Sequence, residues 1–354
     1  MAALLRILLL PSGPGAFRLW LALVVVFHHV TRVEVGKAPV LVFFALSGYW
    51  VHQVWQGRYR HCRRPYLTFL VSRWWRIAPV MVLASGLSLA VLAWLGDPAG
   101  GEAAAMPVRQ ALSAAFALGY AGMPVRPLGP AWSLDIEMQF YLVAPLLVLM
   151  VRRVPAVAAL AAAYGVYAAG MTFYPELVLS SFLPFFVIGM VAAEHRWRVS
   201  RRLAAAGLGA AVALTAAIIA SPWYAPLLGE GGDHWPAVNL LLAALVLPQA
   251  LASAGNPSGA RDKVWADQSY IVYLLHWPAI QVLRGIVWPG PTAKMLGLMV
   301  LAAVVTLLAW AVRRYCDRPL NRARARWVTA RRVASDPADL PDRAKGDDRT
   351  RVFA

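Results

Sequence analysis

The strongest constraint on this chain is a series of apolar segments, each close to the length of a helix that crosses a bilayer. A helix rises about 1.5 Å per residue, so about 20 apolar residues cross the hydrocarbon core of a membrane. Segments of this kind occupy 17–34, 38–56, 76–96, 133–151, 154–174, 177–194, 203–221, 236–253, 266–288 and 294–314. The sequence therefore predicts an all-α, polytopic membrane protein with about ten transmembrane helices.

The composition agrees with this fold class. Of the 354 residues, 60% are hydrophobic and only 14% are charged, which is more apolar surface than one soluble core can bury. The net charge of +17 comes mainly from arginines in short connections beside the apolar segments. That pattern is typical of cytoplasmic loops near anionic membrane lipid and argues against nucleic-acid binding.

The distribution of basic residues predicts which side of the membrane each connection faces. The connections after the second, fourth, sixth and eighth segments are basic, whereas the alternate connections are nearly bare. The basic connections contain Arg58, Arg60, Arg63, Arg64, Arg152, Arg153, Arg196, Arg198, Arg201, Arg202, Arg261 and Lys263. Because basic residues favour the cytoplasmic side, we expect both termini in the cytoplasm. The segment from Pro107 to Gly122 is apolar but short, so it is expected to be re-entrant or interfacial.

Three regions are expected along the chain. Residues 1–16 form a cytoplasmic or interfacial N-terminal segment, and residues 17–320 form the membrane domain. Residues 321–354 form a tail whose basic first part is expected near anionic headgroups and whose end, beyond about Ser335, is expected to be disordered. Cys62 and Cys316 both fall in arginine-rich cytoplasmic connections, so no disulfide is expected. The scattered histidines predict no metal site.

The first apolar segment contains charged side chains that need an explanation at membrane depth. Arg18 and His29 are eleven residues apart, which places them within about 20° on one helix stripe and about 16 Å apart along the axis. His28 is turned about 80° away from Arg18 by the same geometry. The pair predicts a polar stripe inside the helix bundle. The alternative is a structural histidine bonded to a neighbouring helix, with Arg18 reaching the interface.

The second and third segments contain further polar candidates. Ser47 either donates back to the carbonyl of Phe43 or offers a polar contact to a cavity, and Gly48 permits the close approach of another helix. Arg73 and Arg76 are three residues apart and lie on one helix face at the cytoplasmic side. Their guanidinium groups suit a phosphorylated ligand, and the alternative is simple anchoring of the helix on the cytoplasmic side.

Two later segments also combine polar and apolar residues. Asp135 and Glu137 lie in the first turn of the fourth segment, where they stabilise the helix dipole, and Glu137 is also a candidate for the bundle interior. In the ninth segment, Tyr273 and His276 are one turn apart, and Pro278 frees the carbonyl of residue 274. A histidine beside such a break is either structural or catalytic.

Six motifs occur in a characteristic order between about Phe17 and Leu320. They are Arg18 with His29 eleven residues later, FFALSG, RWWRIAP, PAWSLDIEMQFYLVAP, SYIVYLLHWP and YCDRPL. In this order they resemble the bacterial acyltransferase family 3 of integral membrane O-acyltransferases. The resemblance implies a ten-helix protein of the bacterial inner membrane that takes an acyl group, commonly acetyl, from cytoplasmic acyl-coenzyme A. The acceptor it implies is a hydroxyl, often on a carbohydrate of the cell envelope.

The resemblance also implies roles for individual residues. His29 corresponds to the catalytic histidine and Arg18 to its partner, while Arg73 and Arg76 correspond to a pair that holds the donor. Functional or fold-defining positions are matched by Ser47, Trp132 and Glu137. No bound cofactor is implied beyond the acyl-coenzyme A substrate. Whether His29 acts as a general base or carries the acyl group itself stays open.

Departures from the family pattern leave the acceptor class open. This chain has Gly-Ala-Phe-Arg where the family commonly has Asp-Gly-Leu-Arg, and Asp317 stands where glutamate is usual. The sequence has no soluble esterase-like domain of the kind that some members carry, so any acyl relay is expected to finish in the membrane domain or on a partner protein. The rival interpretations are a transporter that uses Arg18, His29 and Glu137 as a proton or anion path, and a non-catalytic acyl-coenzyme A or lipid-binding protein.

Overall fold

The computed structural model describes residues 13–173, 178–286 and 289–333, and within them the chain is helical with no strand. The helices that coincide with the ten predicted segments are α2 (Pro14–Val30), α3 (Lys37–Gly57), α4 (Pro65–Leu95), α7 (Trp132–Arg153), α8 (Ala156–Phe173), α9 (Leu183–Glu194), α10 (Arg201–Ile219), α12 (Trp235–Ala254), α13 (Ala260–Arg284) and α14 (Pro291–Val312). The all-α prediction is confirmed for the described residues.

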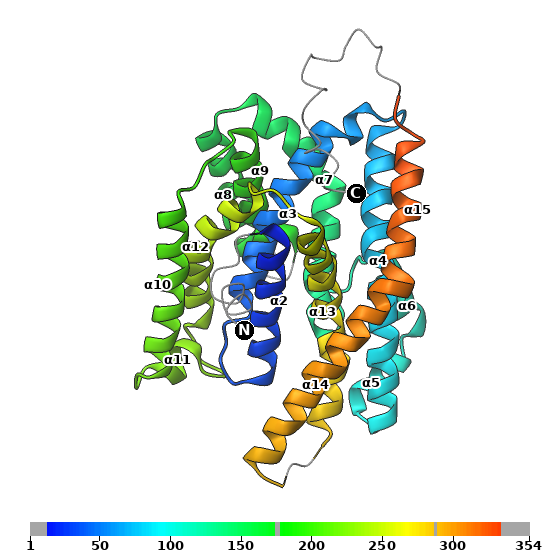
Figure 1. Ribbon diagram of the computed structural model, residues 1–354, viewed down its shortest axis with the longest axis vertical. Helices are drawn as coiled ribbons and strands as arrows, with labels where there is room; N and C mark the ends of the chain where they lie inside the picture. The colour runs from blue at the N-terminus through cyan, green and yellow to red at the C-terminus, as the bar shows by residue number, and fades with distance from the viewer. Residues whose placement is uncertain (1–12, 174–177, 287–288, 334–354) are drawn as a thin grey trace.

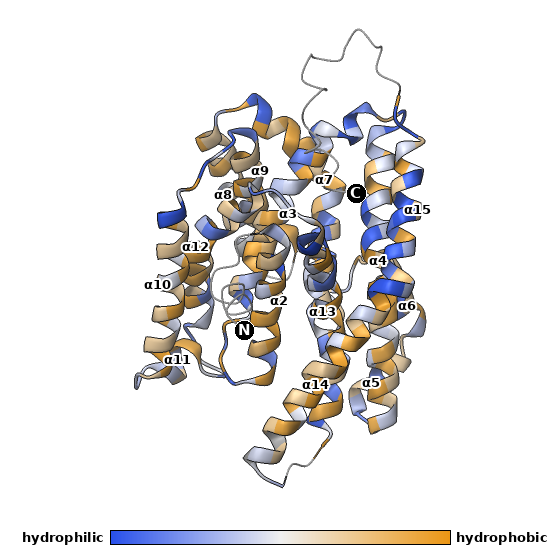
Figure 2. Ribbon diagram, in the orientation of Figure 1, coloured by the Kyte–Doolittle hydropathy of each residue, from blue (hydrophilic) through white to orange (hydrophobic). Residues whose placement is uncertain are grey.

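Figure 1 shows these helices as a bundle. The helices α2, α3 and α13 lie in the middle, α10 and α12 lie on one side of them, and α4 and α15 (Arg318–Thr329) lie on the other. Within the described residues, five helical stretches are long and apolar enough to cross a membrane. They are Pro65–Leu95, Gly129–Arg153, Arg201–Ile219, Trp235–Ala254 and Met295–Thr329. The multi-pass membrane character is therefore confirmed, while the number of spans and the side of the termini stay predictions. Figure 2 shows the many hydrophobic residues along α10, α12 and α14, in keeping with this character.

Short helices fill the connections. Between α4 and α7 lie α5 (Pro98–Ala104) and α6 (Pro107–Phe116), which pack against the lower part of α4. At ten residues, α6 is too short to cross a bilayer, as expected for the segment from Pro107 to Gly122. Between α10 and α12 lies α11 (Tyr224–Leu228). Three 3₁₀ turns, Tyr59–His61, Gly129–Ala131 and Leu179–Phe182, lead into α4, α7 and α9.

An acidic side chain from α13 caps the N-terminus of α2. Both carboxylate oxygens of Asp262 accept hydrogen bonds, one from the backbone nitrogen of Gly15 and one from that of Ala16, each at 2.9 Å. A Cβ on Gly15 would lie 1.9 Å from the backbone oxygen of Asp262, so only glycine permits this approach. Because Pro14 has no N–H group, Gly15 and Ala16 carry unpaired backbone donors of the first turn of α2, and both are satisfied from a distant part of the chain. This contact sets α2, which contains Arg18 and His29, against α13.

A second close crossing joins α3 to α9 through two glycines. A Cβ on Gly48 would lie 2.0 Å from the backbone oxygen of Phe186, and a Cβ on Gly189 would lie 1.8 Å from that of Ala45. The expectation that Gly48 lets another helix approach is confirmed, and the structure identifies that helix as α9. Small residues at a helix crossing let the two backbones pack closely inside a membrane.

The basic part of the C-terminal tail forms α15 and packs along α4 (Figure 1), so the expected domain boundary at residue 320 falls inside this helix. The segment after α15 pairs with the connection between α3 and α4 through backbone hydrogen bonds. The backbone nitrogen of Arg63 donates to the backbone oxygen of Arg331 at 2.9 Å, and the backbone nitrogen of Val333 donates to that of His61 at 3.0 Å. The first part of the tail, expected near headgroups, is thus also part of the protein's own packing. The predicted disorder beyond about Ser335 concerns residues outside the described part.

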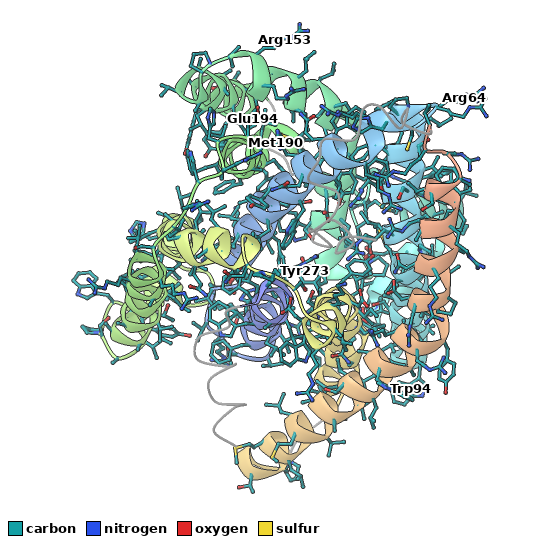
Figure 3. The ribbon with its side chains drawn as sticks, turned by 45° about the horizontal axis from the view of Figure 1, so that its top comes forward. Arg64, Trp94, Arg153, Met190, Glu194 and Tyr273 are labelled. Atoms are coloured by element: carbon teal, nitrogen blue, oxygen red, sulfur yellow. The ribbon has the colours of Figure 1, made fainter. Side chains whose placement is uncertain are left out.

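With the top of the molecule tilted toward the viewer, Arg64 and Arg153 lie at the edge of the bundle, whereas Tyr273 lies among the helices (Figure 3). Cys62 and Cys316 are both free.

Candidate functional site

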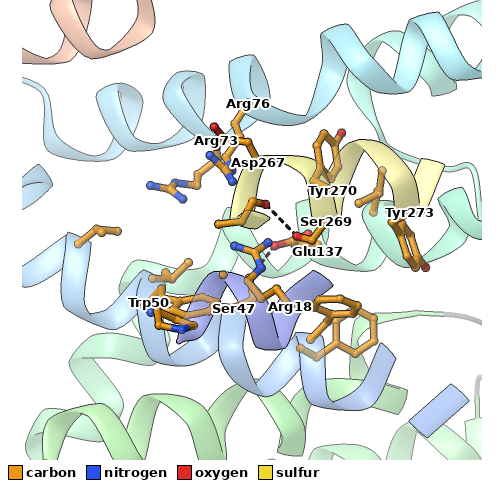
Figure 4. A pocket seen from close by; sticks show the side chains of 18 of the residues that line it. Arg18, Ser47, Trp50, Arg73, Arg76, Glu137, Asp267, Ser269, Tyr270 and Tyr273 are labelled. Atoms are coloured by element: carbon orange, nitrogen blue, oxygen red, sulfur yellow. Dashed lines mark hydrogen bonds between the residues drawn. The ribbon is translucent and has the colours of Figure 1, made fainter. Parts of the chain in front are cut away.

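A cavity of about 290 Å³ lies among α2, α3, α4, α7, α13 and α15. Six of the residues singled out from the sequence line it: Arg18, Ser47, Arg73, Arg76, Glu137 and Tyr273. Figure 4 shows the guanidinium groups of α4 facing Arg18 of α2 across this space, with Glu137 beside Ser47. These six residues come from the five helices α2, α3, α4, α7 and α13, which the fold brings together around the cavity.

The cavity has an excess of positive charge. Five basic side chains line it: Arg18, Arg73, Arg76, Lys263 and Arg324. The acidic residues that line it are Glu137 and Asp267. Asp267 already forms a salt bridge with Arg313 at 3.2 Å. The dielectric constant inside the protein is lower than in water, which strengthens the interactions of these charges, so the excess of basic side chains favours an anionic ligand.

Glu137 is held by two hydroxyl groups. Ser47 donates to Oε1 of Glu137 at 2.6 Å, and Tyr141 donates to the same oxygen at 2.5 Å. The Ser47 hydroxyl therefore points into the cavity and does not donate back to Phe43. A carboxylate that accepts two hydrogen bonds is kept in one orientation, so Glu137 presents a fixed negative charge opposite the arginines.

The arginines retain donor capacity that the protein does not use. The guanidinium of Arg18 stacks over the ring of Trp50, with its central carbon 5.1 Å from the ring centre, and its buried Nε has no hydrogen-bond partner in the described residues. Arg73 donates from Nη2 to the hydroxyl of Tyr59 at 3.2 Å, and its buried Nε also lacks a partner. Buried donors without partners cost free energy unless a ligand satisfies them.

A second cluster of polar residues lies at the other end of α2. The ring of His29 is 5.3 Å from the ring of His276 and 5.0 Å from that of Trp277, and His28 packs against His29 at 4.4 Å. Neither His29 nor His276 lines the 290 Å³ cavity. The predicted stripe on α2 therefore divides between two places: Arg18 faces the cavity, and His29 faces α13 about 16 Å further along the helix axis.

The orientation of His276 follows from its backbone contact. Its Nδ1 lies 3.1 Å from the backbone oxygen of Val272, and because a carbonyl oxygen only accepts, Nδ1 carries the hydrogen. The Nε2 atom is then the acceptor, and it is buried without a hydrogen-bond partner in the described residues. His276 thus contributes an unused buried acceptor beside His29.

Tyr273 lies between the cavity and the histidine cluster. Its side chain lines the cavity, its hydroxyl bonds to that of Ser133 at 2.8 Å, and its ring is 6.2 Å from the ring of His276. Trp132, which the family resemblance gives as a functional or fold-defining position and therefore as a further candidate for the cavity, does not line it. It packs instead against Phe44 and Phe182, with ring centres 6.3 and 5.5 Å away.

Sequence reasoning missed Lys263, Arg324 and Tyr59. The first two lie in basic stretches that suggest only membrane-side anchoring, and nothing in their spacing distinguishes them from neighbouring arginines. Tyr59 lies in a short connection, and only the folded arrangement places its hydroxyl within 2.7 Å of that of Ser72 and beside Arg73.

The chain is similar in sequence to known proteins over most of its length. The model of a family described as "Acyltransferase domain" matches residues 13–314. A protein of Komagataeibacter xylinus named "Putative membrane-bound transacylase BcsY" is 28% identical to this chain over 326 residues, which cover 84% of this chain and 80% of that protein. No solved structure shows a significant match to the chain.

Proposed function

The chain belongs to the acyltransferase domain family, and we propose that it is an O-acyltransferase of the bacterial inner membrane. In this proposal it moves an acyl group, acetyl in the simplest case, from cytoplasmic acyl-coenzyme A to a hydroxyl of a carbohydrate or another cell-envelope acceptor. The observation that most supports the donor is the cavity lined by five basic side chains. Guanidinium groups match the oxygens of phosphate in charge and geometry.

The separation of the two polar clusters suits a donor of this shape. Coenzyme A has its phosphates and its thioester at opposite ends of an extended pantetheine arm. With the phosphates beside Arg73 and Arg76, the arm extends past Tyr273 and brings the thioester toward His29 and His276. The distance of about 16 Å between Arg18 and His29 along α2 then separates donor recognition from chemistry.

The proposed chemistry uses few groups. A base removes the proton of the acceptor hydroxyl, the oxygen attacks the thioester carbonyl, and the thiolate of coenzyme A leaves with a proton. A neutral imidazole at His29 is a suitable base, and in a two-step route its nitrogen would first receive the acyl group. Arg18 lies about 16 Å from His29 along α2, and Glu137 lines the cavity with Arg18, which His29 does not line, so we assign both to the donor side of the reaction.

The decisive experiment measures covalent transfer. Purified protein in lipid is incubated with acetyl-coenzyme A labelled in the acetyl group and with candidate glycans, and the label is followed into the glycan. An acyltransferase moves the label covalently. A transporter would instead produce flux across the membrane without covalent product, and a protein that only binds acyl-coenzyme A would do neither.

A further inference from the structure

The helix α15 contributes a buried arginine to the cavity although it lies beyond the residues 13–314 that match the family model. Arg324 is 2% exposed, whereas Arg322 and Arg326 on the same helix are exposed to solvent. Burial of an arginine side chain is rare unless its charge is compensated. The position of Arg324 therefore requires a specific explanation.

Within the described residues, the hydrogen bonds that Arg324 donates go to neutral side chains. Its Nη1 donates to the hydroxyl of Ser72 at 2.9 Å, and its Nε donates to the side-chain oxygen of Asn321 at 3.1 Å. Asp317 interacts with it electrostatically, but no salt bridge joins Arg324 to a carboxylate within the described residues. Its charged neighbours in the cavity include Arg73 and Arg76. Like charges this close repel each other unless an anion lies between them.

The positive charge of these arginines affects the pKa of Tyr59, which lies in the connection between α3 and α4. Burial by itself would raise the pKa of the Tyr59 hydroxyl, but the charges of Arg73 and Arg324, together with the hydrogen bonds to Ser72 and Arg73, outweigh burial and lower that pKa to about 8. The hydroxyl of Tyr59 also shares Ser72 as a partner with Arg324. The three side chains form one polar network at the edge of the cavity.

Arg324 also enters the cavity from a fixed direction. The helix α15 is held to α4 by packing of Trp327 on Trp75, with ring centres 6.1 Å apart. It is also held to the connection between α3 and α4, where Nη2 of Arg58 donates to the backbone oxygen of Ala325 at 3.4 Å. A guanidinium held in place before a ligand binds loses little conformational entropy on binding.

We propose that Arg324, together with Arg73 and Arg76, forms a phosphate-binding site for the acyl donor, so that α15 supplies part of the donor specificity. This inference rests on the proposed function, because it takes acyl-coenzyme A as the anionic ligand. Three guanidinium groups from α4 and α15 surround the phosphates, while the phosphate-free pantetheine arm makes no contact with Arg324.

The test compares a ligand with phosphates and one without. Equilibrium binding of coenzyme A and of pantetheine is measured on the full-length protein in lipid, for the wild type and for Arg324→Gln. Loss of one charge-assisted contact is expected to weaken coenzyme A binding by roughly ten- to a hundredfold and to leave pantetheine binding unchanged. Arg322→Gln and Arg326→Gln remove exposed charges from the same helix, so both should bind coenzyme A as the wild type does.

The other outcomes each have one meaning. Equal weakening of coenzyme A and pantetheine would show that Arg324 only supports the fold and would overturn the proposal, as would unchanged coenzyme A binding. If Arg324→Gln does not fold, Arg324→Lys keeps the charge without the planar fork, and it should lose affinity for coenzyme A selectively. A wild type that binds coenzyme A through Arg324 but transfers no label would refute the proposed function and leave this site standing.

Discussion

The imidazole rings of His29 and His276 lie 5.3 Å apart with only 22° between their planes, although 247 positions separate the two residues in the chain. Each comes from one of two helices, α2 and α13, that are joined at their other end by the Asp262 cap. The pair places an unused acceptor, Nε2 of His276, beside the histidine proposed for catalysis. We therefore expect the two histidines to act together.

Replacing His29 by alanine should abolish most transfer. The loss of a general base or an acyl carrier is expected to lower the rate at least about a hundredfold. His28→Ala is the matched control, because His28 is directed toward the connection after α2, where its Nδ1 lies 3.1 Å from the backbone oxygen of Val33. The measurement is labelled acetyl transfer at equal amounts of protein in the membrane. Equal transfer by His29→Ala and the wild type would exclude His29 from the chemistry.

Two substitutions at His276 separate its two nitrogens. Asparagine keeps a donor near the Nδ1 position, and that donor can still bond to the backbone oxygen of Val272, but asparagine has no group at the Nε2 position. Glutamine instead places its amide near the Nε2 position. If Nε2 takes part in the reaction, His276→Asn should lose roughly tenfold or more in kcat and His276→Gln should lose less. The reverse order would show that the role of His276 is structural. Donor KM should change little in either variant.

Donor binding should depend on pH through Tyr59. Burial alone would raise the pKa of its hydroxyl, yet the charges of Arg73 and Arg324 and the hydrogen bonds to Ser72 and Arg73 bring that pKa to about 8. The hydroxyl is therefore mostly neutral below pH 8 and mostly ionised above it. The ionised form adds a negative charge where we place the donor phosphates, so donor KM should be constant below pH 8 and should rise above it. In Tyr59→Phe this rise should disappear. A rise of the same size in both proteins would assign the pH dependence to another group.

The close contact between α2 and α13 should not tolerate a side chain on Gly15. A Cβ there would lie 1.9 Å from the backbone oxygen of Asp262, so Gly15→Ala must separate the helices and weaken the cap. We expect a loss of about 1–3 kcal/mol in stability, from the buried donors left unpaired, and a fall in transfer because His29 and His276 move apart. Gly209→Ala in α10 is the control, since a Cβ there meets nothing within 4 Å. Equal thermal stability of the two variants would contradict the tight contact.

Much of the fold follows from sequence patterns that act locally. Apolar segments of membrane length predict the helices, and the ten predicted ranges coincide with helices in the described residues. Their bounds shift where a polar stretch continues the helix: α4 begins at Pro65 instead of near 76, so Arg73 and Arg76 lie well inside it. The ordered motifs also identify the family correctly, because each motif lies within a short stretch of the chain.

Tertiary structure alone decides which residues meet. The angular position of Arg18 and His29 on α2 follows from helix geometry, but their partners, Trp50 for one and His276 for the other, come from helices that periodicity cannot pair. Arg324 is the clearest case: the sequence shows one arginine among many in a basic tail, and only the packing of α15 on α4 buries this one and leaves Arg322 and Arg326 in solvent. Local free energies of helix formation and membrane insertion determine the elements. The site depends instead on contacts between different helices, from tens to hundreds of residues apart in the chain, for which no local signal exists.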